Sequence, residues 1–303
     1  MTKTIHGDAF VWTHLKKPKE EDLVTFAQKH DIHPLLADEL THPTFRPKVE
    51  QYDNFLYLIL HFPVYNDHDS NHGKEIDFLI GKDFLITTQY HVIPALEEFI
   101  ETVTNNKRIA KQYLAGAPGE LLYHLLSYLF TNALTELETM DKKITRMESR
   151  IFKEPSQDLI EDISILRREI LDFRRTMQPQ ESILASFEKE GILFFGNDMR
   201  PYITRIVSDY VRVWHILENH KETIEALHET NASLISMRTA EITKNLTIMA
   251  FITFPLTLLA SLFGMNTKTF PIVGLPHDFW IIIGIMFAGI VTMYFFFRHR
   301  GWI

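Results

Sequence analysis

The chain has 303 residues, of which 46% are hydrophobic and 23% charged, a balance that is ordinary for a folded protein and excludes a disordered one. Its formal net charge of -8 argues against nucleic acid as a partner, because phosphate binding calls for a basic face. The lack of cysteine excludes disulfides, iron–sulfur clusters and thiolate zinc sites, and it agrees with a reducing compartment.

The first hundred residues alternate strand-like and helix-like patterns, which predicts an α/β layer. Strands are expected in DAFVWTHL, NFLYLILHF, EIDFLIG and FLITTQY, which are rich in aromatic and β-branched residues. The segment PKEEDLVTFAQKH starts with proline and has helical spacing. The N-terminal stretch MTKTIHGDAFVW lacks the apolar core of a signal peptide, so we expect this body to stay in the cytoplasm.

Residues from about 120 to 190 have apolar residues at three- and four-residue steps, which predicts two long antiparallel helices. Pro155 breaks the first helix, and Ser156 is a suitable cap for the second, which ends near Pro179. The acidic residues of this hairpin are expected on a solvated face.

A further long helix is predicted from about Pro201, and no stop signal follows before Gly264. A strict alternation of three- and four-residue steps runs along it, through Ile203, Ile206, Tyr210, Val213, Leu217, His220, Ile224, Leu227, Asn231 and Leu234. Such a seam is typical of a coiled coil, although a helix packed on its own domain shows the same stripe. Because the stripe continues into an apolar segment, we favour self-association of several copies around an axis.

Two C-terminal runs, Leu246 to Met265 and Phe279 to Phe297, contain no charged residue and are long enough to cross a hydrocarbon core of about 30 Å. We interpret both as transmembrane helices; a buried hairpin of a soluble protein is the alternative. Basic residues flank the pair, namely Arg238 and Lys244 before it and Arg298, His299 and Arg300 after it, whereas the connection carries only Lys268. The positive-inside rule therefore puts both termini in the cytoplasm.

The first run carries a mostly small or hydroxylated stripe that consists of Thr243, Thr247, Ala250, Phe254, Thr257, Ser261 and Gly264. Close helix packing and the wall of a water-filled path both explain such a stripe. Asn266, in line with the outer end of the stripe, favours a pore, because several copies would form a ring of amides. Neutral carbonyl oxygens suit Mg²⁺, which gives up its waters reluctantly. Phe254 is then either a hydrophobic constriction or an aromatic residue packed beside Pro255.

The sequence resembles the CorA-type magnesium transporters. The resemblance rests on Gly264-Met265-Asn266 after LTIMAFITFPLTLLASLF, and it extends to HPLLADEL, RPKVEQYDNFLYLIL, FLITTQ and the closing RHRGWI. It covers most of the chain.

The resemblance implies a funnel-shaped homopentameric channel in the cell membrane, with Mg²⁺ as the transported and candidate regulatory ion, no other cofactor, and membrane lipids and divalent cations as partners. The implied parts are a cytoplasmic α/β domain (1–200) with the hairpin, a stalk helix (201–245), a pore-lining helix (246–265), an outer loop (266–278), a second span (279–297) and a basic C-terminus (298–303). Asn266 would form the outer ring, with Gly264 and Met265 shaping the turn. Ala240, Thr243, Leu246, Phe254 and Thr257 fall on pore positions, and Lys244, Arg298 and Arg300 match a basic collar.

Four departures from the family pattern concern the pore, its ion and its regulation. Phe263 replaces the usual tyrosine. The outer loop lacks the usual acid and carries Lys268, so a ring of lysines from several copies would repel divalent ions within a Debye length of about 8 Å. Arg205 stands where an acid usually helps bind regulatory Mg²⁺, which leaves Asp209 as the candidate ligand. Ala240 and Thr243 stand at inner pore positions that often hold asparagine and methionine.

Two rival interpretations stay open. The first keeps the fold and changes the ion to Zn²⁺, Co²⁺ or Ni²⁺. The second is a membrane-anchored enzyme or sensor with a metal site at Asp67, His68, Asp69 and His72 or at His30 and His33. Solvated-loop and helix-start roles explain these residues better, and the sequence has no phosphate loop, catalytic triad or paired acid motif.

Overall fold

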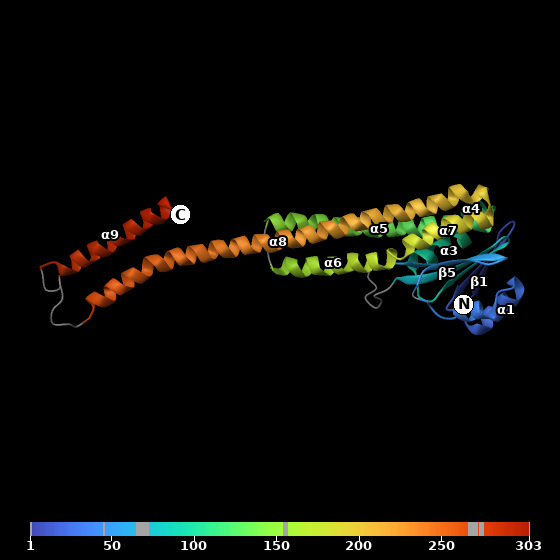
Figure 1. Cartoon of the computed structure of the whole chain (residues 1–303), viewed down its shortest axis with the longest axis horizontal. Coiled ribbons are helices and arrows are strands. Elements are labelled where there is room, and N and C mark those ends of the chain that lie inside the picture. The colour runs from blue at the N-terminus through green and yellow to red at the C-terminus, as the bar shows by residue number, and fades with distance from the viewer. Residues whose placement is uncertain are drawn as a thin grey trace. The chain divides into compact units, whose positions relative to one another are not determined.

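The computed structural model describes residues 2–44, 46–64, 73–153, 157–265, 272 and 276–302. The chain divides into two compact units, Met1–His228 and Glu229–Ile303. One long helix, α8 (Arg200–Phe263), contributes residues to both units (Figure 1).

Unit one is built on a six-stranded mixed sheet. Its strands are β1 (Thr2–His6), β2 (Val11–Lys16), β3 (Lys48–Gln51), β4 (Phe55–Phe62), β5 (Lys74–Gly81) and β6 (Phe84–Gln89), in the order β1-β2-β6-β5-β4-β3. Only the β2–β6 pair is parallel. The four expected strands are present, and β1 and β3 are short additions at the two edges. Every residue of β4, β5 and β6 is buried, so these strands form the centre of the unit.

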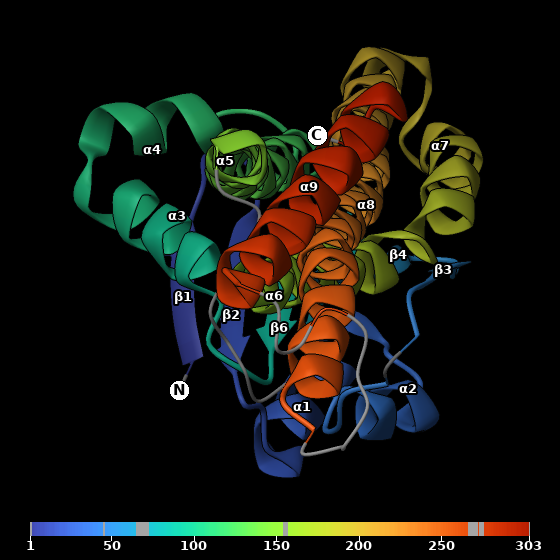
Figure 2. The same ribbon diagram turned by 90° about the vertical axis from the view of Figure 1, so that its left-hand side faces the viewer.

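Helices cover both faces of this sheet (Figure 2). On one face, α1 (Glu20–His30) and α2 (Pro34–Glu39) close an apolar cluster that includes Leu36, Tyr57 and Leu79. The other face is covered by α3 (Pro94–Asn105), α4 (Lys107–Tyr113), α5 (Pro118–Lys153), α6 (Gln157–Met177) and α7 (Gln180–Phe195). Aromatic contacts fix this layer: Trp12 of β2 meets Phe99 of α3, and Phe62 of β4 meets Phe130 of α5.

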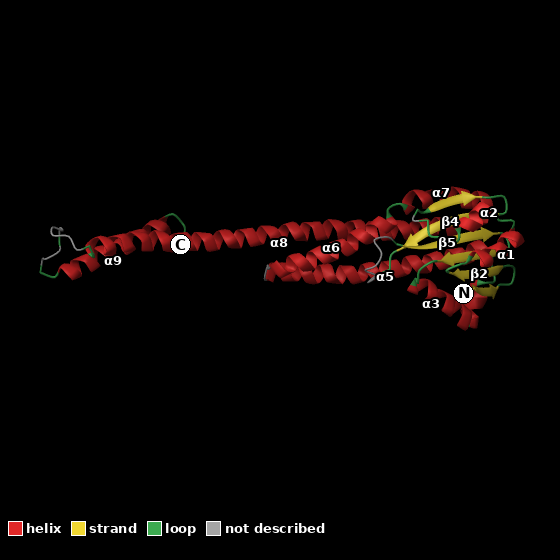
Figure 3. Cartoon of the chain, turned by 90° about the horizontal axis from the view of Figure 1, so that it is seen from below, coloured by secondary structure: helices red, strands yellow, loops and turns green. Residues whose placement is uncertain are grey.

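The helices α5 and α6 form the antiparallel pair that the sequence predicts (Figure 3). Lys143 pairs with Glu169 at 2.9 Å and Arg150 with Asp162 at 2.6 Å, so positions further along α5 meet positions earlier in α6. The residues from Gln180 onward form a separate helix, α7, which is followed by a 3₁₀ turn (Asn197–Met199) and α8.

The heptad seam of α8 is buried inside unit one of a single chain. Val213, Leu217 and Ile224 are 0% exposed. The phenol of Tyr210 donates a hydrogen bond to the carbonyl of Met177 at 3.0 Å, which fixes α8 on α6. A Cβ at Gly191 of α7 would lie 2.9 Å from Cδ1 of Ile203, so a larger residue there would push this methyl group aside. The prediction that the seam joins several copies is therefore wrong for Ile203 to Leu227, which pack on their own domain.

A buried side-chain amide ties α7 to the sheet. Strand β3 pairs with β4 only as far as Ile59, so the next residues of β4 have a free edge. Gln180 fills it: its Nε2 donates to the carbonyl of His61 at 2.7 Å, and its Oε1 accepts from the amide of His61 at 3.3 Å. The amide thus imitates the peptide group of a neighbouring strand.

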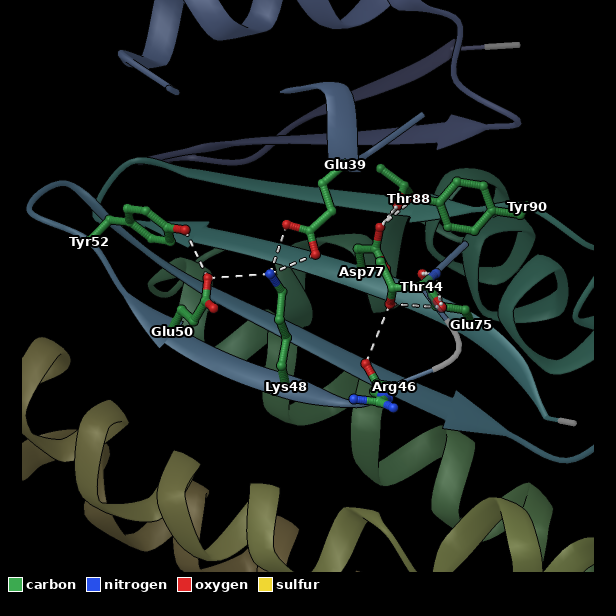
Figure 4. A network of polar contacts seen from close by, with 10 residues as sticks. All are labelled: Glu39, Thr44, Arg46, Lys48, Glu50, Tyr52, Glu75, Asp77, Thr88 and Tyr90. Carbon is green, nitrogen blue, oxygen red and sulfur yellow. Dashed lines mark hydrogen bonds and ion pairs between the residues drawn. The ribbon is translucent and has the colours of Figure 1, made fainter. Parts of the chain in front are cut away.

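Two acidic residues of β5 are buried under the α1–α2 layer (Figure 4). Asp77 Oδ2 accepts hydrogen bonds from Tyr90 at 2.6 Å and Thr88 at 2.9 Å. Burial and the charge of Glu75 raise the pKa of Asp77 well above its usual value. Burial also acts to raise the pKa of Glu75, but hydrogen bonds from His61 and Thr44 outweigh it and lower that pKa. Asp77 therefore holds its proton more strongly than Glu75.

Candidate functional site

Unit two contains the end of α8 and the helix α9 (Asp278–His299). Among the described residues, these two helices are long and apolar enough to cross a membrane. Their most apolar windows are only 6% and 0% buried. A core helix of a soluble protein would be mostly buried, so this exposure favours lipid as the surroundings.

The helix α9 runs back along one side of α8. The rings of Phe251 and Phe297 lie 6.3 Å apart, and Ile248 and Phe297 are each 7% exposed. These contacts belong to the bulky apolar face of α8, on which Ile252, Leu256 and Leu259 are half-buried. The apolar face of α8 is therefore the face that its own chain covers.

The small and hydroxylated stripe occupies the side of α8 that α9 leaves uncovered. Thr247 and Ala250 are half-buried, and the exposed positions are Ala240, Thr243, Leu246, Phe254, Thr257 and Ser261. Phe254 is 73% exposed. The structure thus brings the predicted pore-lining residues together on one open face, which the described residues of unit two leave uncovered.

Threonine hydroxyls on this part of α8 donate to carbonyls one turn back. Thr247 bonds to Thr243 at 2.8 Å, and Thr257 bonds to Thr253 at 2.9 Å. Each hydroxyl hydrogen has a partner within the helix, while the oxygen keeps lone pairs for water or an ion's hydration shell. Thr253 is an exposed hydroxyl beside the stripe that the seven-residue spacing omitted, and its own Oγ1 bonds to Met249 at 2.9 Å.

The proposed selectivity motif follows the last turn of α8. The amide of Gly264 bonds to the carbonyl of Ala260 at 3.0 Å, and the amide of Met265 bonds to Leu262 at 3.3 Å, so the helix ends in a tight turn. Both residues are exposed, Met265 by 55%. Asn266 and Lys268 lie outside the described residues, and the roles expected of them stay predictions.

The proposed basic collar is exposed. Lys244, Arg298 and Arg300 all face solvent in the single chain. The guanidinium of Arg300 lies 5.8 Å from the ring of Phe296, and the Trp302 ring stacks on Phe297 at 5.8 Å. Such a cluster of aromatic and basic side chains after an apolar helix is typical of a membrane–water interface.

Asp209, the candidate regulatory ligand, already has two partners. Arg205 Nε lies 3.1 Å from its Oδ1, and the hydroxyl of Ser127 donates to its Oδ2 at 2.9 Å. Its side chain is only 14% exposed. A cation at this carboxylate would have to displace Arg205.

The histidines of the rival metal site have structural roles. His33 caps α2, because its Nδ1 accepts the amide hydrogen of Leu35 at 3.2 Å. The His30 ring lies 4.0 Å from the ring of Phe84. Asp67, His68, Asp69 and His72 lie outside the described residues. Within the described part of the chain, no group of three or more His, Cys, Asp or Glu side chains could hold a metal ion.

The chain combines an α/β unit with two exposed apolar helices, the first of which is the end of the long helix α8. This combination defines an integral membrane protein with a large domain outside the bilayer. Residues 7–299 match the family described as "CorA-like Mg2+ transporter protein". The chain belongs to this family. Its class of activity is therefore divalent-cation transport, and the family is one of transporters, not enzymes.

Relatives and solved structures agree with this assignment. A cobalt/magnesium transport protein CorA of Thermotoga maritima is 24% identical over 274 residues, which are 90% of this chain and 77% of the relative. The complete CorA magnesium transporter of Methanocaldococcus jannaschii has a TM-score of 0.81 at 19% identity and covers 97% of this chain and 92% of its own. The ZntB cytoplasmic domain of Vibrio parahaemolyticus reaches 0.62 at 14% identity, over 77% of this chain and 90% of its own. At these identities the structural likenesses establish the fold, and they confirm the predicted α/β domain, long helix and two apolar C-terminal helices.

Proposed function

We propose that this chain imports Mg²⁺ through a pore that five copies form around the stripe of α8. The observation that carries the proposal is the uncovered face of α8 between Thr243 and Ser261, because α9 packs on the opposite, apolar side. Family membership supports Mg²⁺ as the ion. The threonine hydroxyls already donate within the helix, so it is their oxygen lone pairs that lipid leaves without a donor and that water in a central path would satisfy.

In this proposal, Asn266 supplies the outer ring that receives the hydrated ion. Five amides would offer carbonyl oxygens to the water shell of Mg²⁺ without removing it, which suits an ion that dehydrates reluctantly. Below the ring, hydroxyl oxygens of Ser261 and Thr257 would accept hydrogen bonds from the same shell. Phe254 would then narrow the path, and Leu246 and Thr243 would line its inner part.

The proposed topology has both termini in the cytoplasm. Residues 1–200 form the cytoplasmic domain, 201–245 the stalk, 246–265 and 279–297 the two spans, 266–278 the outer loop and 298–303 the cytoplasmic tail. The exposed Lys244, Arg298 and Arg300 support this orientation, because basic residues collect on the cytoplasmic side. Asp209 stays a candidate ligand for regulatory Mg²⁺, in competition with Arg205.

The test is Asn266→Ala in a host that depends on Mg²⁺ and lacks its own uptake systems. We expect the intact chain to restore growth at low Mg²⁺ and the variant to fail at equal amounts in the membrane. Asn245→Ala is the matched control, because it removes an exposed amide of α8 that lies off the stripe. Full rescue by Asn266→Ala would contradict the amide ring.

The ion itself is tested by competition. In vesicles that contain the purified protein, Mg²⁺ is expected to compete with a flux of Co²⁺ or Ni²⁺, and the cobalt/magnesium name of the Thermotoga maritima relative supports Co²⁺ as a second ion. Failure of Mg²⁺ to compete with Zn²⁺ would favour the zinc alternative. Since that result leaves the pore intact, it is distinct from failure of the Asn266 test.

A further inference from the structure

A groove of 550 Å³ lies between α6 and α8 within unit one. It is lined by Ser164, Arg167, Arg168, Leu171, Asp172, Arg175 and His228. Its volume falls within the range of about 300–1,000 Å³ that small-molecule sites occupy. The lining contains three arginines and one apolar side chain, Leu171, in a chain whose net charge is -8.

The arginines of this groove differ in the ion pairs and hydrogen bonds that they form. Arg174 lies next to Arg175 in the sequence but does not line the groove; it forms an ion pair with Glu218 at 2.5 Å and lies over the ring of Trp214. Within the groove, Arg167 makes only a 3.7 Å pair with Glu225, and Arg175 bonds to Asp172 of its own helix at 3.2 Å. Arg168 is exposed and has no ion pair or hydrogen bond with any described residue.

The acids near the groove do not neutralise it. Two acids, Asp172 and Glu225, stand against four basic side chains, namely the three groove arginines and Lys221, which lies 3.3 Å from Glu225. An excess of positive charge therefore remains on the α6 side. Because a guanidinium presents several N–H donors in a planar fork, it suits phosphate oxygens better than a lysine would.

We propose that this groove binds an anion that carries several phosphates. Arg168 and Arg175 are seven residues apart on one face of α6, about 10 Å along the helix axis. A single phosphate would contact both guanidinium groups only if the two side chains bent toward each other, whereas a chain of two or three phosphates spans this separation. Leu171 lies between them and offers an apolar contact to whatever the phosphates carry. This site is independent of the ion that the pore transports.

Isothermal titration calorimetry tests the site on the full-length protein in neutral detergent and Mg²⁺-free buffer. The probes are inorganic tripolyphosphate, ATP and dihexanoyl phosphatidylglycerol below its micellar concentration. We expect saturable binding of tripolyphosphate, and Arg168→Gln is expected to weaken it by about tenfold or more. Arg146→Gln, which removes an exposed arginine of α5 outside the groove, is expected to leave it unchanged.

The probes also separate the sources of the anion. Tighter binding of ATP than of tripolyphosphate would assign the groove to a nucleotide. Tighter binding of the phosphatidylglycerol, which has a single phosphate, would overturn the proposal of a ligand with several phosphates and favour a lipid headgroup. No saturable binding of any probe below about 1 mM would overturn the proposal. Equal losses in the Arg168 and Arg146 variants would also overturn it, because they would mean non-specific attraction. Thermal unfolding of each variant checks that the fold is intact.

Discussion

The two units of the chain differ in how much of their apolar surface the chain itself buries. In unit one the central strands and the seam of α8 are buried by the same chain, with Leu217 and Ile224 at 0% exposure. In unit two large apolar side chains stay open, including Phe254 at 73% and Trp280 at 69%. One chain is thus enough to specify the first unit, whereas the second depends on lipid and on further copies. Two substitutions test this difference, and a third tests the buried acid of unit one.

The largest effect is expected from a charge in the buried seam. Ile224→Asp would place an unpaired carboxylate at a site with 0% exposure, at a cost of at least about 4 kcal/mol, which is much of the stability of a typical domain. We expect little folded protein, measured as the yield of monodisperse material and by circular-dichroism melting. The control Val211→Asp lies on the same helix at 39% exposure and should be tolerated. Normal yield of Ile224→Asp would mean that unit one does not bury this seam by itself.

A smaller, functional effect is expected on the open face of unit two. If Phe254 narrows the pore, Phe254→Ala should raise ion flux per protein by roughly threefold or more, without lowering the melting temperature. Phe251→Ala is the matched control, because Phe251 packs on Phe297 at 6.3 Å. It should lower the melting temperature and leave the flux per folded protein unchanged. Flux is measured in vesicles with an ion-sensitive dye, and the reverse pattern would make Phe254 a packing residue.

The smallest effect concerns Asp77, the buried acid of β5 whose pKa is raised. Its folded pKa is raised, so its stabilising contribution is complete below the unfolded pKa of about 3.9, declines above it, and is lost once the pH passes the folded pKa. The loss is about 1.4 kcal/mol for each pH unit in that window. In Asp77→Asn, the amide oxygen accepts from Thr88 and Tyr90 and the NH₂ faces Glu75, so the variant imitates the protonated acid.

We therefore expect Asp77→Asn to flatten the fall in unfolding free energy that begins as the pH rises above about 4, where the aspartate of the unfolded chain loses its proton. Denaturant unfolding followed by tryptophan fluorescence measures it. Asp53→Asn, at an exposed site, should keep the slope of the original chain. Parallel slopes for all three proteins would show that Asp77 does not hold its proton.

Much of the fold could be predicted, because its signals are local. The absence of a stop signal predicts one helix from about Pro201 to Gly264, and α8 spans Arg200–Phe263. The strands β1 and β3 were missed, since TKTIH and KVEQ are short edge segments with half-exposed side chains. The seam shows why partners are harder to predict: a three-four spacing fixes which side of a helix is buried but not which chain buries it.

The candidate site could likewise be predicted only in part. Helical spacing alone placed Thr243, Phe254 and Thr257 on one face, because the regular turn of an α-helix fixes the direction of each side chain. It gave no signal for the bond between Ser127 and Asp209, which are 82 positions apart, nor for the Arg205 pair that engages the other carboxylate oxygen. Polar contacts between distant segments follow from tertiary packing, which a single sequence does not reveal.

The amide of Gln180 has a consequence for how copies of this chain meet. An open strand edge invites a strand from another molecule, and proteins protect such edges to avoid aggregation. At His61 the edge of β4 is already occupied, since one glutamine takes both its N–H and its C=O. The chain thus closes a route to sheet-to-sheet assembly at this edge with one side chain, and contacts between copies are left to helices and loops there.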